Sequence, residues 1–397
     1  MRVRALVVAV VAVLSLAACG GDPASLPKAG QHGHTSAGSS STASAASSGV
    51  PTVKAKPVAL RRGERFLELR MPHPYTPSVP TIGTDEYRCF LLDPKLSKDA
   101  VITGTDFLPG NVKEVHHVIL YKVDPQDVAA AKALDAKDPG DGWTCFGGTG
   151  IREGGAGAQQ IDQAPWLGAW APGGTEKVTP PGIGTSLPEG SQIVMQIHYN
   201  LLDGSSPDQS AAKLRIATDD GSYNYLHTTL LPAPIELPCR DGVANKLCSR
   251  DAAMADNYAR FGTEAKLADL LHLLCGPEPV GPTQSCTRPV AEPMVVRAIA
   301  GHMHLLGRSI SVVADKGTPK EKTLLDIATW DFDNQGSIPL PQPVRLTPTD
   351  TLTVTCTHDQ SLRDKLPAFA GTKERYVVWG EGTTDEMCLG IVLFTKS

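Results

Sequence analysis

Gln192-Ile193-Val194-Met195-Gln196-Ile197-His198-Tyr199 is a short apolar run that ends in a histidine and a tyrosine. The turn-forming cluster Leu187-Pro188-Glu189-Gly190-Ser191 precedes it. Short apolar runs bounded by Pro and Gly are typical of strands in antiparallel β-sandwiches. Similar runs recur at residues 117–121, 294–299 and 351–355. With 38 Gly and 32 Pro for turns, the chain is expected to be all-β.

One segment departs from this pattern. Residues 250–274 carry apolar side chains at helical spacing, with Cys239 and Cys248 before them and Cys275 and Cys286 after them. We expect a short helical insertion at about residues 239–286, flanked by disulfides, in the second of two domains. Four cysteines allow three pairings, and their spacing does not choose among them.

The beginning of the chain predicts export. Arg2 and Arg4 precede an apolar run at residues 5–16, and Leu16-Ala17-Ala18-Cys19 resembles a bacterial lipobox. We therefore expect a lipoprotein signal peptide at residues 1–19 and a lipidated, palmitate-bearing Cys19 that anchors the protein to a bacterial membrane, at the cell surface or the periplasmic face. An ordinary secretion signal with a chance cysteine is the alternative. Residues 20–55 are rich in Ser, Ala and Gly and predict a flexible tether.

Length and charge limit the possible organisation of the rest of the chain. About 340 residues remain after the tether, which exceeds the usual size of a single core, so two domains are expected at residues 56–225 and 226–397. The net charge is −5 and no basic block is present, which argues against nucleic acid as a partner. Eight of the nine cysteines come after Cys19, and an even number in an exported protein favours disulfides.

Six side chains in the chain can bind a transition metal. They are His116, His117, His198, His302, His304 and Met387. Imidazole suits several metals, but a soft thioether stabilises Cu(I) and has little use in a zinc site. The set therefore points to copper, and if it divides into two sites the protein holds two coppers.

Each group of histidines also has a simpler reading. His302 and His304 share one face if they lie on a strand, although two surface histidines fit the same spacing. His116 and His117 face opposite sides of a regular strand, so both bind one metal only if the backbone is kinked or the rings use different nitrogens. One core and one exposed imidazole fit that pair equally well. His198, inside an apolar run, also fits a core histidine.

Four motifs, in this order, carry a resemblance to a known family. They are Val115-His116-His117-Val118-Ile119-Leu120-Tyr121, Gln196-Ile197-His198-Tyr199, Gly301-His302-Met303-His304-Leu305-Leu306-Gly307 and Asp385-Glu386-Met387-Cys388. Through them, over roughly residues 60–397, the chain resembles the copper type II, ascorbate-dependent monooxygenases, among them peptidylglycine α-hydroxylating monooxygenase and dopamine β-hydroxylase. The resemblance implies two consecutive jelly-roll-like β-sandwich domains with one copper on each, facing a solvent-filled cleft.

The resemblance also implies a role for each ligand. His116, His117 and His198 would hold an electron-transfer copper, and His302, His304 and Met387 a catalytic copper. It further implies the disulfides Cys356–Cys388 and Cys89–Cys145. The expected reaction is hydroxylation of a C–H bond in a small-molecule or peptide-like substrate, with O₂ and an external one-electron donor such as ascorbate.

Two departures bear on the substrate. In the peptide-hydroxylating enzyme, two positions help to bind the substrate carboxylate. Here these positions are occupied by Ala300 and Ile391, which argues against peptides ending in glycine as substrates. A membrane-tethered copper-binding or copper-delivery protein without turnover is the alternative function, because His and Met ligands suit it equally well. Zinc hydrolysis is a third reading, against which the methionine ligand argues.

Overall fold

The computed structural model describes residues 58–78, 84–138, 140–146, 148–151, 165–202, 204–262 and 266–397. Ala55–Ser397 form one compact unit. The expected signal peptide, the lipidation site at Cys19 and the tether lie outside the described residues. Within the described part of the chain, no helix is both long enough and apolar enough to cross a membrane.

The first half of the unit is a β-sandwich. Its strands are β1 (Arg65–Arg70), β2 (Asp85–Leu92), β3 (Ala100–Leu108), β4 (Val115–Val123), β5 (Trp143–Thr144), β6 (Trp166–Trp170), β7 (Lys177–Val178), β8 (Ile183–Leu187), β9 (Gln192–Asn200) and β10 (Ala211–Thr218). One sheet has the order β5-β2-β9-β4-β6, and the other contains β1-β10-β3-β8, with β7 beside β3. Phe90, Leu120 and Ile193 of the first sheet share a core with Ile102 and Leu214 of the second.

The second half is also a sandwich. Its strands are β11 (Asn224–Pro232), β12 (Thr283–Pro289), β13 (Met294–His302), β14 (Gly307–Ala314), β15 (Lys322–Ile327), β16 (Ile338–Leu346), β17 (Thr351–His358) and β18 (Leu389–Lys396). The sheet order is β12-β17-β14-β15 on one side and β11-β18-β13-β16 on the other. Val312 and Val354 from the first sheet meet Val296 and Val392 from the second in one core.

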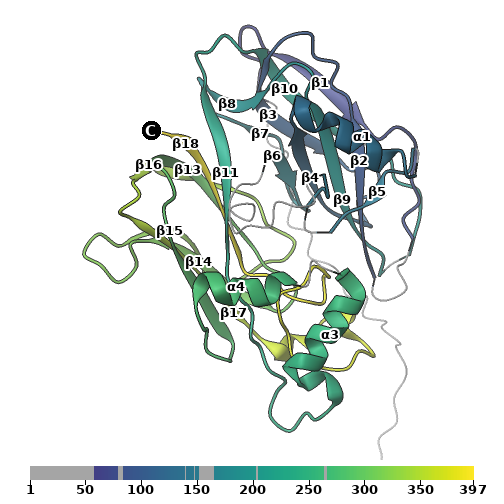
Figure 1. The fold of residues 1–397 in the computed structure, drawn as a ribbon, viewed down its shortest axis with the longest axis vertical. Helices are drawn as coiled ribbons and strands as arrows, with labels where there is room; N and C mark the ends of the chain where they lie inside the picture. The colour runs from purple at the N-terminus through teal and green to yellow at the C-terminus, as the bar shows by residue number, and fades with distance from the viewer. Residues whose placement is uncertain are drawn as a thin grey trace, which may run out of the picture. The chain divides into compact units, whose positions relative to one another are not determined.

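A parallel strand pair joins the two sandwiches into one unit. Asn224 and Tyr225 of β11 pair with Ile183 and Gly184 of β8, so one nine-stranded sheet runs through both halves. Figure 1 shows β11 passing between them. The all-β sandwich prediction is confirmed. The shared sheet was not expected, and the boundary placed between residues 225 and 226 falls inside β11.

Helices are few and short among the described residues. They are α1 (Val128–Asp135), α3 (Arg250–Phe261), α4 (Leu267–Cys275), and the 3-10 turns η1 (Pro125–Asp127), η2 (Lys246–Cys248), η4 (Gln360–Asp364) and η5 (Pro367–Phe369). α3 and α4 lie in the expected insertion. The structure pairs Cys239 with Cys248 and Cys275 with Cys286, the pairing that spacing left open.

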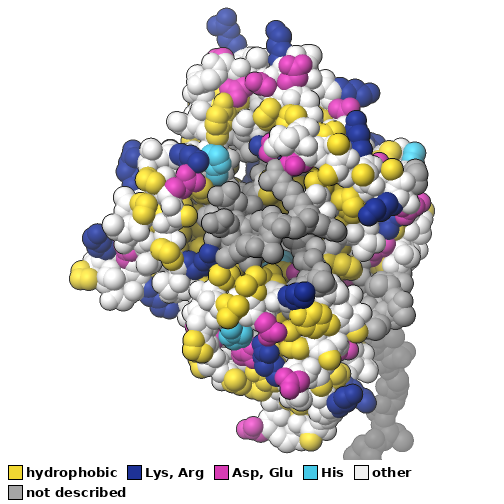
Figure 2. All heavy atoms as spheres, viewed as in Figure 1, with side chains coloured by type: hydrophobic (Ala, Val, Ile, Leu, Met, Phe, Trp, Pro, Cys, Tyr) yellow, Lys and Arg dark blue, Asp and Glu magenta, His cyan; other side chains and the backbone are white. Residues whose placement is uncertain are grey.

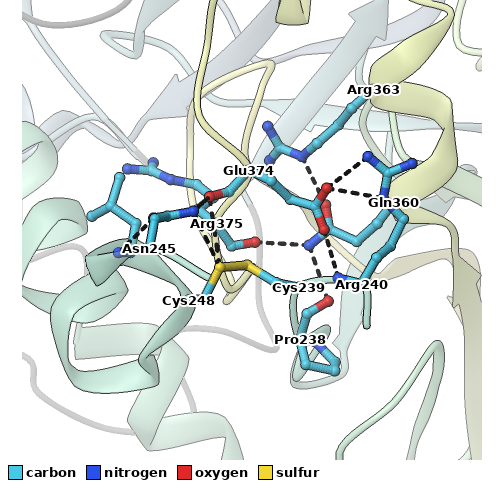
Figure 3. The surroundings of a disulfide bond; sticks show 10 residues. Pro238, Cys239, Arg240, Asn245, Cys248, Gln360, Arg363, Glu374 and Arg375 are labelled. Carbon is cyan, nitrogen blue, oxygen red and sulfur yellow. Dashed lines mark hydrogen bonds and ion pairs between the residues drawn. A yellow bond between two sulfur atoms is a disulfide. The ribbon is translucent and has the colours of Figure 1, made fainter. Parts of the chain in front are cut away.

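The residues around the first of these disulfides are bound to the segment that follows η5 (Figure 3). Arg240 donates to the Glu374 carboxylate from its backbone N, at 2.6 Å, and from its guanidinium, at 2.7 and 2.9 Å. Asn245 Nδ2 donates to the Glu374 carbonyl at 2.8 Å. The start of the insertion is therefore fixed to residues close to Arg375, which matters for the site below.

Surface charge follows the composition. On the face in Figure 2, Lys and Arg side chains are scattered among Asp and Glu rather than gathered in one patch. The face drawn thus shows no basic stripe, and the expectation that nucleic acid is not a partner stays a prediction.

The packing of β8 against β3 predicts the effect of one substitution. A Cβ on Gly184 would lie 2.7 Å from the Ile102 carbonyl oxygen and 2.2 Å from Val101 Cγ1. Gly184→Ala should therefore lower the free energy of unfolding by about 1–3 kcal/mol, measured by urea denaturation, because the packed strands must shift. Gly148→Ala is the control, since a Cβ added there would have no heavy atom within 4 Å. Equal stability of the two variants would contradict this account of the packing between β8 and β3.

Candidate functional site

His198 lies on the outer face of the five-stranded sheet. Along β9, Ile193, Met195 and Ile197 point into the sandwich core, so Gln196 and His198 point to the opposite face. His198 is opposite Tyr87 on β2 and opposite His117 on β4. The alternation of β9 thus places His198 outside the core but still leaves it fully buried.

A β-bulge brings His116 and His117 to the same place. The register of β4 against β9 shifts between Val115 and His117, and His116 is the extra residue. His116 Nδ1 lies 3.1 Å from His198 Nδ1. One ligand atom from each of His116, His117 and His198 lies within 4.8 Å of the others. The structure therefore supplies the kink that a shared metal requires.

Asp85 and Tyr87 orient His198 from the neighbouring strand. Asp85 Oδ1 lies 2.9 Å from His198 Nε2, and the Tyr87 ring stacks on His198 at 4.1 Å with 11° between planes. With Nε2 committed to a carboxylate, Nδ1 is the nitrogen that faces His116. Sequence reasoning missed both residues. Their i, i+2 spacing puts them on one face of a strand, but the pairing of β2 with β9 is not readable from the sequence.

A disulfide closes the same face. Cys89 of β2 is bonded to Cys145, which follows β5. Gln196 Nε2 donates to the carbonyls of Cys145, at 3.4 Å, and Gly148, at 3.2 Å. The residue beside the His-Tyr motif thus holds the disulfide segment against the sheet.

His302 and His304 lie at the end of β13. His302 is the last residue of the strand and His304 follows it in a turn, with their ring centroids 5.1 Å apart. His302 Nδ1 lies 2.6 Å from the Gln335 side-chain oxygen. His304 is fully buried, and neither of its ring nitrogens has a hydrogen-bond partner. Met303 packs in the core, as expected.

Met387 lies just before β18, the strand beside β13. Leu389, two residues later, is opposite His302, and Cys388 is bonded to Cys356 of β17. Met387 is buried. The preceding Glu386 accepts hydrogen bonds from the backbone N of His304 at 3.0 Å and of Leu306 at 2.5 Å. One buried carboxylate therefore ties the methionine segment to the two-histidine turn.

The two groups of histidines meet. The ring centroids of His117 and His302 are 6.0 Å apart, and Phe332 stacks on His116 at 4.5 Å. Phe332 belongs to the same loop as Gln335, whose Nε2 donates to the Phe332 carbonyl at 2.8 Å. The resemblance implied two sites that face a solvent-filled cleft. In the structure, rings from the two groups instead lie close to each other.

Burial keeps the imidazoles of His116, His117, His302 and His304 neutral, because it lowers the pKa of each. It lowers the pKa of His116, His117 and His304 well below 6.5, and the neighbouring imidazoles lower it further. Burial also lowers the pKa of His302 to about 4, against the effect of Gln335. Neutral imidazole is the form that binds a metal.

The helical insertion contacts the methionine segment directly. Arg260 of α3 donates to both Asp385 carboxylate oxygens, at 2.5 and 2.6 Å, and to Asp256 at 2.9 Å. Arg375 reaches the same two aspartates. Although burial raises the pKa of Asp385, the two guanidinium groups hold it below its usual value. The insertion therefore clamps the residue two positions before Met387.

The donor set can be compared with the needs of a metal. His116 Nε2, His117 Nδ1 and both nitrogens of His304 are buried without a hydrogen-bond partner, which is costly for a polar group that binds nothing. Imidazoles and a thioether are ligands that copper accepts, and the carboxylate on His198 is a typical outer partner of a ligating histidine. The residues present fit copper.

Comparison with known proteins supports this chemistry in the second half of the chain. Residues 282–396 match the model of the copper type II ascorbate-dependent monooxygenase, C-terminal domain. None of the curated proteins matches the chain.

Likenesses to solved structures are weak. The major capsid protein P2 of bacteriophage PM2 is 12% identical, with a TM-score of 0.30 over 84% of this chain and 97% of that chain. The cowpea mosaic virus top component is 9% identical, with a TM-score of 0.28 over 88% of this chain and 94% of that chain. Scores of this size carry no argument about fold or function.

The clamp on the methionine segment leads to a prediction. Arg260→Met leaves the buried Asp385 carboxylate with only Arg375, at 3.4 Å, and the Gly382 backbone N, at 3.2 Å, so the free energy of unfolding should fall by about 3 kcal/mol. Hydrogen exchange of the backbone amides at residues 380–388 should also become faster. Arg250→Met is the matched control on the same helix, because Arg250 pairs with Glu236 and Asp269 instead. If both variants change exchange at 380–388 equally, the clamp does not act locally.

Proposed function

Since residues 282–396 match the C-terminal domain of the copper type II ascorbate-dependent monooxygenases, we propose that this chain is a copper-dependent monooxygenase with two mononuclear coppers. His116, His117 and His198 hold the first copper, and His302, His304 and Met387 hold the second. The observation that carries the proposal is the convergence of five histidines, three of them with unpartnered buried nitrogens, where two halves of the chain meet.

Bound copper would supply one-electron transfer and the activation of O₂ for attack on a C–H bond. The overall reaction adds one oxygen atom to the substrate: R–H, O₂, two electrons and two protons give R–OH and water. An external donor such as ascorbate provides the electrons. The protein residues therefore need to place ligands, limit access of water and position the substrate.

The outer partners of the histidines select which nitrogen faces the metal. Asp85 occupies Nε2 of His198, and Gln335 occupies Nδ1 of His302. A histidine held on one nitrogen keeps its ring orientation and presents the other nitrogen. Phe332, stacked on His116, places an apolar ring over the first set. These contacts support different surroundings for the two coppers.

Two residues near the second set bear on the substrate. Ala300 and Ile391 are opposite one another on β13 and β18, two residues from His302 and Leu389 respectively. Neither carries a charge or a hydrogen-bond donor in its side chain. This pair supports a substrate that does not present a carboxylate at this position.

Met387→Ile tests the proposed roles. Wild-type protein should hold two coppers per chain and consume O₂ with ascorbate and a hydroxylatable substrate. The variant should keep one copper and lose O₂ uptake at least about tenfold, because a ligand is missing from the second set only. Copper per chain and oxygen-electrode traces measure both.

Met303→Ile is the matched control, because Met303 lies beside the ligands but packs in the core. It should retain uptake. Hydroxylation that survives Met387→Ile would sink the ligand assignment. Two coppers per chain in the wild type, with no uptake across a broad substrate panel, would favour a copper carrier instead.

Export and anchoring remain part of the proposal. The four disulfides support an oxidising compartment. Labelled palmitate should be incorporated by the wild-type chain and not by Cys19→Ala, which should leave the membrane fraction. Labelling that persists in Cys19→Ala would exclude Cys19 as the lipidated residue.

A further inference from the structure

Asp85 contacts both His198 of the first set and the segment that leads to Met387. It is the first residue of β2, it lies opposite Asn200 of β9, and its side chain is 6% exposed. Besides His198 Nε2, it accepts a hydrogen bond from Asn200 Nδ2 at 3.4 Å. The neighbouring Thr84 Oγ1 donates to Asp85 Oδ2 at 3.5 Å. Two further hydrogen bonds come from a distant part of the sequence.

Thr383 supplies them. Its backbone N donates to Asp85 Oδ2 at 3.2 Å, and its hydroxyl donates to Asp85 Oδ1. Asn200 Nδ2 also donates to the Thr383 hydroxyl oxygen, at 3.3 Å. Thr383 is 1% exposed, so water does not replace these contacts. A buried carboxylate thus binds a first-set histidine and a second-half threonine at once.

Tyr87 makes a second connection of the same kind. Its hydroxyl donates to the Glu381 carbonyl at 2.8 Å, and its ring stacks on His198. Both residues that orient His198 therefore also bind residues 381–383.

The backbone between Thr383 and Met387 is held in turn. The Gly382 backbone N donates to Asp385 Oδ2 at 3.2 Å, and Arg260 grips the same carboxylate. Glu386 is bound to the backbone of His304 and Leu306. Because residues 382–386 are held by these hydrogen bonds, a displacement of Thr383 also moves Met387.

We propose that Asp85 is a positioning residue shared by the two copper sites. Its carboxylate orients His198 and, through Thr383, holds the segment that carries Met387, so copper bound at the first set strengthens copper binding at the second. This inference rests on the proposed function. Thermodynamic linkage makes the coupling reciprocal.

Thr383→Val tests the coupling, because it removes the hydroxyl at nearly constant shape. Thr383→Ser, which keeps the hydroxyl, is the control. The first set is disabled by His117→Ala, alone and combined with each Thr383 variant. Competition with a chromophoric Cu(I) chelator gives the affinity of the second set, and the copper–sulfur signal in X-ray absorption identifies binding at Met387.

In the wild-type background, His117→Ala should lower the Cu(I) affinity of the second set about tenfold, the size of effect common for outer-sphere partners. In Thr383→Val the second set should already be weakened, and His117→Ala should weaken it little more. Thr383→Ser should behave as the wild type. Double-mutant comparison isolates the contribution of the hydroxyl.

An equal effect of His117→Ala in the Thr383→Val and wild-type backgrounds would overturn the coupling and leave the proposed function standing. A wild-type chain that shows no copper–sulfur signal would overturn both.

Discussion

The parallel pairing of β8 with β11 is the constraint on which the other features depend. It makes one sheet continuous through both sandwiches, so the ends of β4 and β9 from the first half are held beside the end of β13 from the second. Hydrogen bonds of Asp85 with Thr383 and of Tyr87 with the Glu381 carbonyl join the two halves as well. In the structure that results, the ring centroids of His117 and His302 are 6.0 Å apart.

The sequence anticipated the all-β architecture and the helical insertion, because both rest on local patterns of apolar residues, turns and cysteines. It also singled out the six candidate ligands, whose metal roles stay predictions. It did not reveal Asp85, Gln335 or Arg260. Each acts through a partner more than thirty residues away, and such pairs depend on strand register and loop packing, which periodicity does not encode.

The kink at His116 shows the same limit in a favourable case. Adjacent residues on a regular strand point to opposite faces, so His116 and His117 can bind one metal only if the strand is irregular. The β-bulge at His116 provides this irregularity. The sequence alone could state this requirement, but only the strand register could show that it is met.

The ion pairs of Asp385 with Arg260 and Arg375 are a different case. An intact buried ion pair adds little net stability, although removing one partner is costly, and here the pairs fix the backbone two residues before Met387.

Two of the disulfides differ sharply in burial. Both sulfur-bearing residues of Cys356–Cys388 are fully buried, whereas Cys239 and Cys248 are partly exposed. Thiol exchange needs a thiolate to reach a sulfur atom. A small reductant in solution therefore meets Cys239–Cys248 directly but reaches Cys356–Cys388 only after the second sandwich opens. Such a reductant can therefore exchange with Cys239–Cys248 while the disulfide beside Met387 stays oxidised.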